Sequence, residues 1–295
     1  MNELKGLGVA MITPFTKAGE VDVTALKKLT DHLVTEGADY LVVMGTTGES
    51  VTLNKEERKL VLDTVMACNN GRKPIVLGIG GNNTQDIAAQ LSRLETHGIS
   101  AILSVTPYYN KPTQNGLYEH YKALSESSKL PIILYNVPGR TGVNLLPDTV
   151  SRIAFDCRNV IGIKEASGNV EQVMAVIQQT PKEFMVISGD DALTLPLIAS
   201  GADGVISVVG NAFPKEFSEM VHHALNNEMD QARAIHYRLL DIIHLLFTEG
   251  NPAGIKEVLD QLNICEHYLR LPLVPVSHTT SEKLRHEMID QGFLS

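Results

Sequence analysis

Residues 37–43, Gly-Ala-Asp-Tyr-Leu-Val-Val, decide the fold because they join the end of a helix to a buried strand. The glycine can take the left-handed conformation that closes a helix. The run that follows is apolar without a polar face, as expected for a parallel strand covered on both sides. The same arrangement recurs at Gly98-Ile99-Ser100 and at Gly201-Ala202-Asp203, each just before another apolar run. The chain is therefore built from a repeated helix–strand unit.

Eight apolar runs of this kind follow one another, with room for one helix between neighbours. Eight strand–helix units predict an α/β fold of the (β/α)₈ TIM-barrel class. The alternative is an open, doubly wound sheet, which usually carries a glycine-rich dinucleotide fingerprint. Gly78-Ile79-Gly80-Gly81 lacks the third glycine of that fingerprint, so the sequence favours the barrel. The runs begin at Gly8, Tyr40, Pro74, Ala101, Pro131, Val160, Phe184 and Gly204.

The end of the chain has a helical pattern that lies outside the eight units. An apolar stripe runs through residues 230–248, and Asn251-Pro252 then opens a second helix. A last helix is predicted from Ser281. We therefore expect a catalytic barrel over residues 1–225 and a C-terminal α-helical domain over residues 226–295.

Composition excludes several classes of protein. The 295 residues are 43% hydrophobic and carry a formal net charge of −9. An acidic chain without a run of Lys or Arg lacks the footprint of a nucleic-acid binder. No apolar stretch approaches the ~18 residues that cross a bilayer, so we expect no membrane partner. Three widely spaced cysteines indicate reduced thiols and a cytoplasmic location. The ten histidines show no ligand spacing, so we expect no metal.

Lys164 is the main candidate for chemistry, at the end of the run Val-Ile-Gly-Ile-Lys. Alternation along a strand puts Gly162 and Lys164 on one face and Ile161 and Ile163 on the other. If the isoleucines pack against helices, Lys164 points into the barrel at the strand end where barrel enzymes have their active sites. Burial favours the neutral amine, which is a nucleophile. From the residues alone, an ion pair with Glu165 or a position at the rim explains this lysine equally well.

Other strand ends carry groups suited to proton transfer and to binding acids. Tyr135 shares a strand face with Ile133 and predicts either a proton-shuttling phenol or a half-buried aromatic. Thr46-Thr47-Gly48-Glu49 gathers hydroxyls and amides in one turn, which suits a carboxylate or is an ordinary junction. Arg140 lies on a loop stiffened by proline and glycine, where it either clamps a carboxylate or extends into solvent.

Together these strand ends resemble the dihydrodipicolinate synthase family, within the pyruvate-dependent Schiff-base aldolase/N-acetylneuraminate lyase superfamily. The resemblance covers essentially the whole chain in order. It implies a lyase that condenses pyruvate with L-aspartate 4-semialdehyde to 4-hydroxy-tetrahydrodipicolinate, the first committed step of diaminopimelate and lysine biosynthesis. The motifs that carry it are Gly45-Thr46-Thr47-Gly48-Glu49-Ser50, Thr106-Pro107-Tyr108-Tyr109-Asn110, residues 135–142, Gly162-Ile163-Lys164-Glu165-Ala166, Ser188-Gly189-Asp190-Asp191, Gly204-Val205-Ile206-Ser207 and residues 269–273.

The resemblance also implies roles for individual residues. Lys164 would form the Schiff base with pyruvate. The proton relay would consist of Tyr135, Thr46 and Tyr109, with Tyr109 supplied by a neighbouring subunit. The pyruvate carboxylate would be held by Thr47 and that of the semialdehyde by Arg140, while Gly189 and Ile206 line the pocket. No cofactor is expected, because the iminium is itself the electron sink.

Two other functions compete with this one. The same barrel serves N-acetylneuraminate lyases and 2-keto-3-deoxy-sugar-acid aldolases. In the lyases the residue matching Thr46 is usually serine and the arginine matching Arg140 is typically absent, so both residues favour the synthase. The third hypothesis is a non-catalytic, ligand-binding barrel, which should have lost Lys164 or the tyrosines.

The resemblance further implies a homotetramer, a dimer of tight dimers, and in some family members inhibition by lysine at a subunit contact. Ser50, Asn82 and Tyr108 fit the inhibited pattern, and Asp86 is one methylene shorter than the usual glutamate. Lys55 and Arg58 stand where inhibited enzymes usually carry histidines. Two added cations repel a cationic ligand, so we expect weak or absent feedback. Val51 is the last of the positions in this chain that match the lysine site of the inhibited enzymes.

Overall fold

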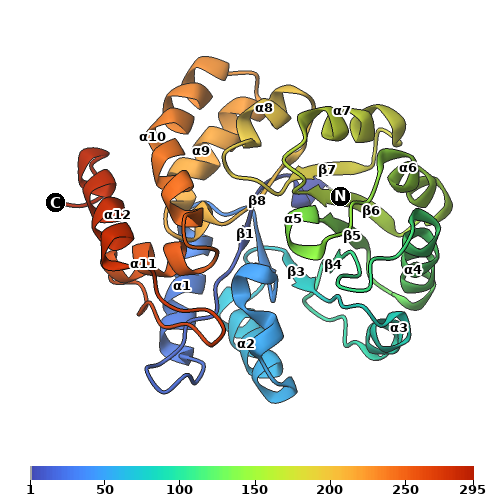
Figure 1. The fold of residues 1–295 in the computed structure, drawn as a ribbon, viewed down its shortest axis with the longest axis horizontal. Helices are drawn as coiled ribbons and strands as arrows, with labels where there is room; N and C mark the ends of the chain where they lie inside the picture. Colours follow the sequence, from blue (N-terminus) through green and yellow to red (C-terminus); the bar gives the residue numbers. More distant parts are fainter. Residues whose placement is uncertain (1) are drawn as a thin grey trace.

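The computed structural model describes residues 2–295 and contains eight parallel strands that close into a barrel (Figure 1). Strands adjacent in sequence are adjacent in the sheet, and β8 (Gly204–Ser207) pairs with β1 (Gly6–Ala10) to close the ring. This confirms the predicted TIM barrel and excludes the open sheet. Met1, the first residue of the predicted barrel domain, lies outside the described residues. The other strands are β2 (Tyr40–Val43), β3 (Ile75–Gly78), β4 (Ala101–Val105), β5 (Ile132–Asn136), β6 (Val160–Glu165) and β7 (Met185–Ser188).

Helices separate consecutive strands and cover the outside of the barrel (Figure 1). They are α1 (Val23–Thr35), α2 (Lys55–Asn69), α3 (Thr84–Arg93), α4 (Gln114–Ser127), α5 (Pro138–Thr141), α6 (Pro147–Asp156), α7 (Val170–Gln179), α8 (Thr194–Ala199) and α9 (Pro214–Leu225). Short 3₁₀ turns occupy Asn2–Leu4 (η1), Thr46–Gly48 (η2), Ser50–Thr52 (η3) and Val209–Asn211 (η4).

Local sequence signals set the helix ends. Asn54 accepts from the Glu57 amide while the Glu57 carboxylate accepts from the Asn54 amide, which is a capping box at the start of α2. Gly37, Gly98 and Gly201 have φ of +109°, +77° and +110°, so each takes a conformation that other residues avoid as the chain turns toward the next strand. The predicted capping box and the predicted helix-closing glycines Gly37 and Gly201 are confirmed. The prediction is wrong for Gly98, because α3 already ends at Arg93 and Gly98 lies in a separate turn before β4.

The strands separate two hydrophobic layers. In β2, Tyr40 and Val42 belong to a cluster inside the barrel, whereas Leu41 and Val43 belong to the larger cluster between strands and helices. Because both faces are buried, the strands carry the continuous apolar runs seen in the sequence.

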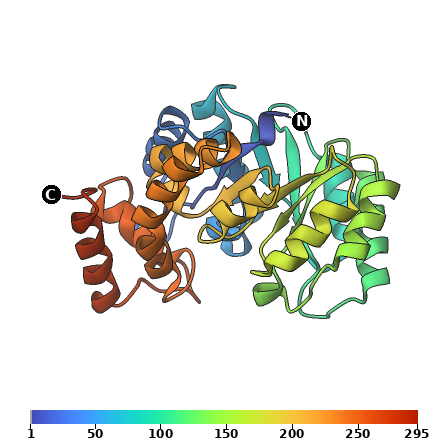
Figure 2. The same cartoon turned by 90° about the horizontal axis from the view of Figure 1, so that it is seen from above.

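Three further helices, α10 (Met229–Phe247), α11 (Ala253–Gln261) and α12 (His278–Asp290), pack together at one end of the molecule (Figures 1 and 2). The last helix begins three residues before the predicted Ser281, because the Ser277 hydroxyl caps it by accepting from the Thr280 amide. Side chains of all three helices join the outer hydrophobic cluster of the barrel. The division into domains at residue 225 stays a prediction.

Candidate active site

Lys164 and Tyr135 lie side by side at the carboxyl ends of β6 and β5, where they are register partners. Their exposed fractions are 6% and 7%, and Nζ of Lys164 lies 4.5 Å from the centroid of the Tyr135 ring. Glu165 is not the partner of the lysine: its carboxylate accepts from Asn136 and Gln172. The structure therefore places a buried amine next to an aromatic ring inside the barrel.

The predicted alternation along β6 holds for Lys164 but is wrong for Ile161. Ile163 packs in the outer cluster as expected, whereas Ile161 packs against the inner one. The reason is a register shift near the start of β6, where Val160 pairs with Ile132 but Gly162 pairs with Ile133. The extra residue breaks the two-residue period before Gly162 and leaves it intact from Gly162 to Lys164.

Gly189 directly follows β7, and Ile206 lies within β8. A Cβ built on Gly189 would come within 3.0 Å of Lys164 Cε and 2.6 Å of Ala166 Cβ, so only glycine fits there without displacement. Ile206 is 1% exposed and shares the inner cluster with Tyr135. Gly189 thus borders the lysine chain, and Ile206 lies in the inner cluster that also contains Tyr135.

The two threonines of the turn after β2 differ in their exposure to solvent. Thr46 is exposed, whereas Thr47 is buried and its Oγ1 accepts a hydrogen bond from Nδ2 of Asn251 at 3.0 Å. The Gly48 carbonyl accepts from the Thr13 hydroxyl at 2.7 Å. This turn presents one hydroxyl to the open end of the barrel and holds the other in a fixed place.

Glu49 completes the turn as part of a buried ion pair that the sequence analysis did not anticipate. Oε1 of Glu49 lies 2.5 Å from Nζ of Lys256, and the two side chains are 1% and 0% exposed. Burial lowers the pKa of Lys256, and the nearby Glu49 carboxylate opposes that effect. Lys256 and Asn251 are more than 200 residues away in the chain, and their positions were interpreted only as part of a C-terminal helix.

Arg140 lies exposed in α5, on a loop that is fixed at its base. The Asn136 side chain donates to Asn144 Oδ1 at 2.8 Å and accepts from the Leu145 amide at 2.9 Å, which ties both ends of the loop to β5. The guanidinium is therefore available to solutes on a backbone held in place.

Tyr109 is 88% exposed at a φ of +72°, on the loop that follows β4. Such exposure is unusual for a large aromatic side chain. Tyr108 is 37% exposed, and its carbonyl accepts from Nδ2 of Asn82 at 3.3 Å. The loop thus carries its two tyrosines at the surface and keeps neither against Lys164.

The remaining positions of the predicted lysine site lie in η3 and in the first turns of α2 and α3. The Arg58 guanidinium donates to the Ser50 and Leu53 carbonyls at 2.9 and 3.1 Å. Asp86 accepts from Nδ2 of Asn83 at 2.7 Å.

Asp191 is a further buried group near the site that sequence reasoning did not single out. It is 2% exposed, and its Oδ2 accepts from the amides of Val208 and Val209, which follow β8. Burial raises the pKa of this carboxyl to about 6. Asp191 thereby ties the loop after β7 to the loop after β8, next to Ile206.

Other features of the described residues lie apart from these groups. A surface hollow of about 840 Å³ lies at the opposite, amino-terminal ends of the strands, between Lys5, Asp39 and His97. Within residues 2–295, no three His, Cys, Asp or Glu side chains gather as metal ligands would. No helix in that range combines the length and apolarity needed to cross a membrane.

Known proteins resemble this chain along its whole length. A family model described as "Dihydrodipicolinate synthetase family" matches residues 3–291. The 4-hydroxy-tetrahydrodipicolinate synthase of Parabacteroides distasonis is 54% identical over 96% of this chain and 95% of its own, and that of Flavobacterium psychrophilum is 51% identical over 96% and 97%. The crystal structure of dihydrodipicolinate synthase from Thermotoga maritima superposes with a TM-score of 0.95 at 42% identity, covering 98% of this chain and 99% of that one.

Proposed function

The chain belongs to the dihydrodipicolinate synthetase family, and we infer that it condenses pyruvate with L-aspartate 4-semialdehyde to give 4-hydroxy-tetrahydrodipicolinate. It is therefore a lyase-type enzyme of the diaminopimelate and lysine pathway. Its residue roles are our proposal, and the observation that carries them is the buried Lys164 amine beside the Tyr135 ring.

We propose that Lys164 attacks the ketone carbon of pyruvate. The ketone oxygen leaves as water, and the product is an iminium that takes up electrons when the methyl group loses a proton. The resulting enamine carbon then attacks the aldehyde carbon of the second substrate. The burial of Lys164 inside the barrel supports this role, and Gly189 supports it by leaving room beside the lysine chain.

We propose that Tyr135, Thr46 and Tyr109 move the protons of these steps. Tyr135 is next to the amine, and Thr46 is exposed at the same end of the barrel. Tyr109 extends away from its own lysine, which supports a role in the site of a neighbouring subunit. The proposal therefore includes self-association, as a homotetramer built from tight dimers.

Two acidic substrates require two carboxylate sites, and we assign one to Thr47 and one to Arg140. The Thr47 hydroxyl and the amides of its turn suit the small pyruvate carboxylate. The Arg140 guanidinium suits bidentate binding of the semialdehyde carboxylate, and a sugar polyol offers no such group. Ile206 and Gly189 would close the pocket around the reacting carbons.

Regulation and location are proposals as well. We propose weak or absent lysine feedback at Ser50, Asn82, Asp86 and Tyr108. We also propose a cytoplasmic location, which the free thiols of all three cysteines support.

The test is intact mass after treatment with pyruvate and borohydride, which reduces an imine to a stable amine. We expect one pyruvate-derived adduct in the wild type and none in Lys164→Ala. Adducts in both proteins, or in neither, would overturn the assignment of Lys164. Turnover with aspartate semialdehyde, compared with N-acetylmannosamine and sugar-derived aldehydes, then distinguishes the synthase from the related lyases and aldolases.

A further inference from the structure

The C-terminal segment, residues 251–270, contacts the turn that carries the two active-site threonines. Asn251 donates to Thr47, Lys256 pairs with Glu49, and the Arg270 amide donates to Oε2 of Glu49 at 3.1 Å. Thr13, three residues after β1, holds the Gly48 carbonyl between them. Three consecutive residues of the turn, Thr47, Gly48 and Glu49, are thus each held by a residue distant in the chain.

The backbone of this turn needs such support. Met44 and Glu49, which bracket it, have φ of +61° and +50°, in the left-handed region that side chains other than glycine rarely occupy. Conformations of this kind persist where the surrounding structure holds them. The ion pair on Glu49 acts directly on one of the two strained residues.

The hydrogen bond between Asn251 and Thr47 has a chemical direction. A threonine hydroxyl has one proton and two lone pairs. Because Nδ2 of Asn251 donates into one lone pair, the proton of Thr47 stays free to be donated to another group. Oδ1 of Asn251 is buried without a partner, and leaving an acceptor unpaired costs free energy of folding. Stability of the fold alone therefore does not explain an asparagine at this position.

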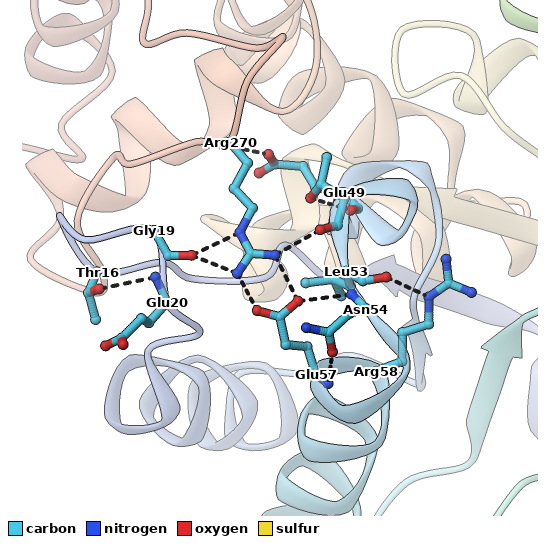
Figure 3. Close-up of polar contacts among 10 residues, drawn as sticks. Thr16, Gly19, Glu20, Glu49, Leu53, Asn54, Glu57, Arg58 and Arg270 are labelled. Atoms are coloured by element: carbon cyan, nitrogen blue, oxygen red, sulfur yellow. Dashed lines mark hydrogen bonds and ion pairs between the residues drawn. The ribbon is translucent and has the colours of Figure 1, made fainter.

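The ion pair belongs to a larger cluster around Phe15, whose ring contacts both Lys256 and Arg270. Lys256 also donates to the Tyr268 carbonyl at 2.8 Å. On the outer side, the Arg270 guanidinium donates to the Gly19 carbonyl at 2.8 Å and forms a bidentate pair with Glu57 (Figure 3). The Glu57 carboxylate contacts Asn54 and Arg270 but none of residues 46–49, so Glu57 provides a matched control.

We propose that Asn251 and the Lys256–Glu49 pair are positioning residues for pyruvate, through which the C-terminal segment directs the Thr47 hydroxyl proton to the substrate carboxylate. This inference rests on the proposed role of Thr47 in pyruvate binding. A buried ion pair is weak evidence of a stabilising role, because desolvation offsets its attraction. The position of the Lys256–Glu49 pair next to the strained threonine turn indicates instead that the pair holds this turn in one conformation.

The test measures the pyruvate concentration that gives half-maximal borohydride trapping, together with KM for aspartate semialdehyde and the melting temperature. In Asn251→Asp, a carboxylate of the same shape accepts a hydrogen bond from the Thr47 hydroxyl, so that the hydroxyl proton is no longer free for the substrate. We expect half-saturation to rise at least tenfold in this variant and several-fold in Asn251→Ala, with KM for the semialdehyde within twofold of wild type. The control Glu57→Gln should leave pyruvate half-saturation unchanged even where it lowers the melting temperature.

A second set of variants separates positioning from stability. Lys256→Met leaves the buried Glu49 carboxylate without its partner, and the double variant Lys256→Met with Glu49→Gln removes both charges. We expect the double variant to recover melting temperature relative to Lys256→Met but not pyruvate affinity. Recovery of both would overturn the proposal, as would unchanged half-saturation in folded Asn251 variants. Absence of any adduct in the wild type would instead overturn the proposed function itself.

Discussion

Replacing Gly189 by alanine tests how the pocket accommodates the proposed Schiff-base lysine. The new Cβ would lie 2.6 Å from Ala166 Cβ, 3.0 Å from Lys164 Cε and 3.1 Å from the Glu165 carbonyl oxygen. Carbon atoms in contact normally lie ~3.5–4.0 Å apart, so the lysine chain must move by about 0.5 Å and the β6 backbone next to it by more.

These displacements give two expected magnitudes. Overpacking of this kind costs about 1–3 kcal/mol of folding free energy. A displacement of the reacting amine by about half an ångström lowers kcat by roughly ten- to a hundredfold, since a 1 Å misplacement costs ~100-fold. Because Gly189 does not have a positive φ, the effect arises from contact and not from the backbone.

The assay compares kcat, the rate of borohydride trapping with pyruvate, and thermal unfolding in Gly189→Ala. Gly81→Ala is the control, because its Cβ would meet only Ile87, at an ordinary 3.6 Å. The control should retain kcat within about twofold. A folded Gly189→Ala enzyme with wild-type kcat and trapping rate would refute the packing argument and, with it, the placement of Lys164 Cε against Gly189.

Three further predictions follow from other parts of the molecule. Arg140→Ala should raise KM for aspartate semialdehyde by about ten- to a hundredfold, because a charged hydrogen bond is lost, and should leave pyruvate trapping unchanged. Equal effects on both substrates would contradict the assignment of Arg140 to the semialdehyde carboxylate. The hydrogen-bonded Arg270 guanidinium lowers the pKa of Glu57 from 4.5 to about 2, so the pair stabilises the fold above pH 4.5 and loses that effect as the pH falls toward 2. Glu57→Gln should therefore lower the free energy of unfolding in urea at pH 7 by about 2 kcal/mol, a value reduced for the partial exposure of Glu57. About half of this difference between wild type and variant should disappear between pH 5 and pH 3. A difference that does not change with pH would argue against the ion pair. A lysine titration should show little inhibition because of Lys55 and Arg58, and full inhibition below about millimolar lysine would contradict this.

Much of the site followed from local sequence because parallel strands in a barrel all end at one face. Once the runs were located, Tyr135, Lys164 and Gly189 were expected at that face, and the structure brings them together. Ile206 was expected only from the family resemblance, and it shares the inner cluster with Tyr135. The inward direction of Lys164 needed only the two-residue period of a strand. The same period failed at Ile161, because a register shift depends on pairing with β5 and leaves no mark in the sequence of β6 alone.

The support of the threonine turn could not be predicted in this way. Asn251 and Lys256 are separated from Thr47 and Glu49 by 204 and 207 positions, and their spacing in the chain says nothing about that contact. A buried lysine also contradicts the usual rule that charged side chains face water, so composition and pattern place Lys256 on a helix surface.

By itself, the sequence determined the class of fold, the ends of several helices and the set of polar groups at the strand ends. These depend on interactions between near neighbours, such as the Asn54–Glu57 capping box and the alternation along each strand. Only the tertiary structure decided that Glu49 would be buried against Lys256 and that Thr47 would accept its hydrogen bond from Asn251. Those contacts join segments at opposite ends of the chain, and they form only when the barrel has closed and the C-terminal helices have packed beside it.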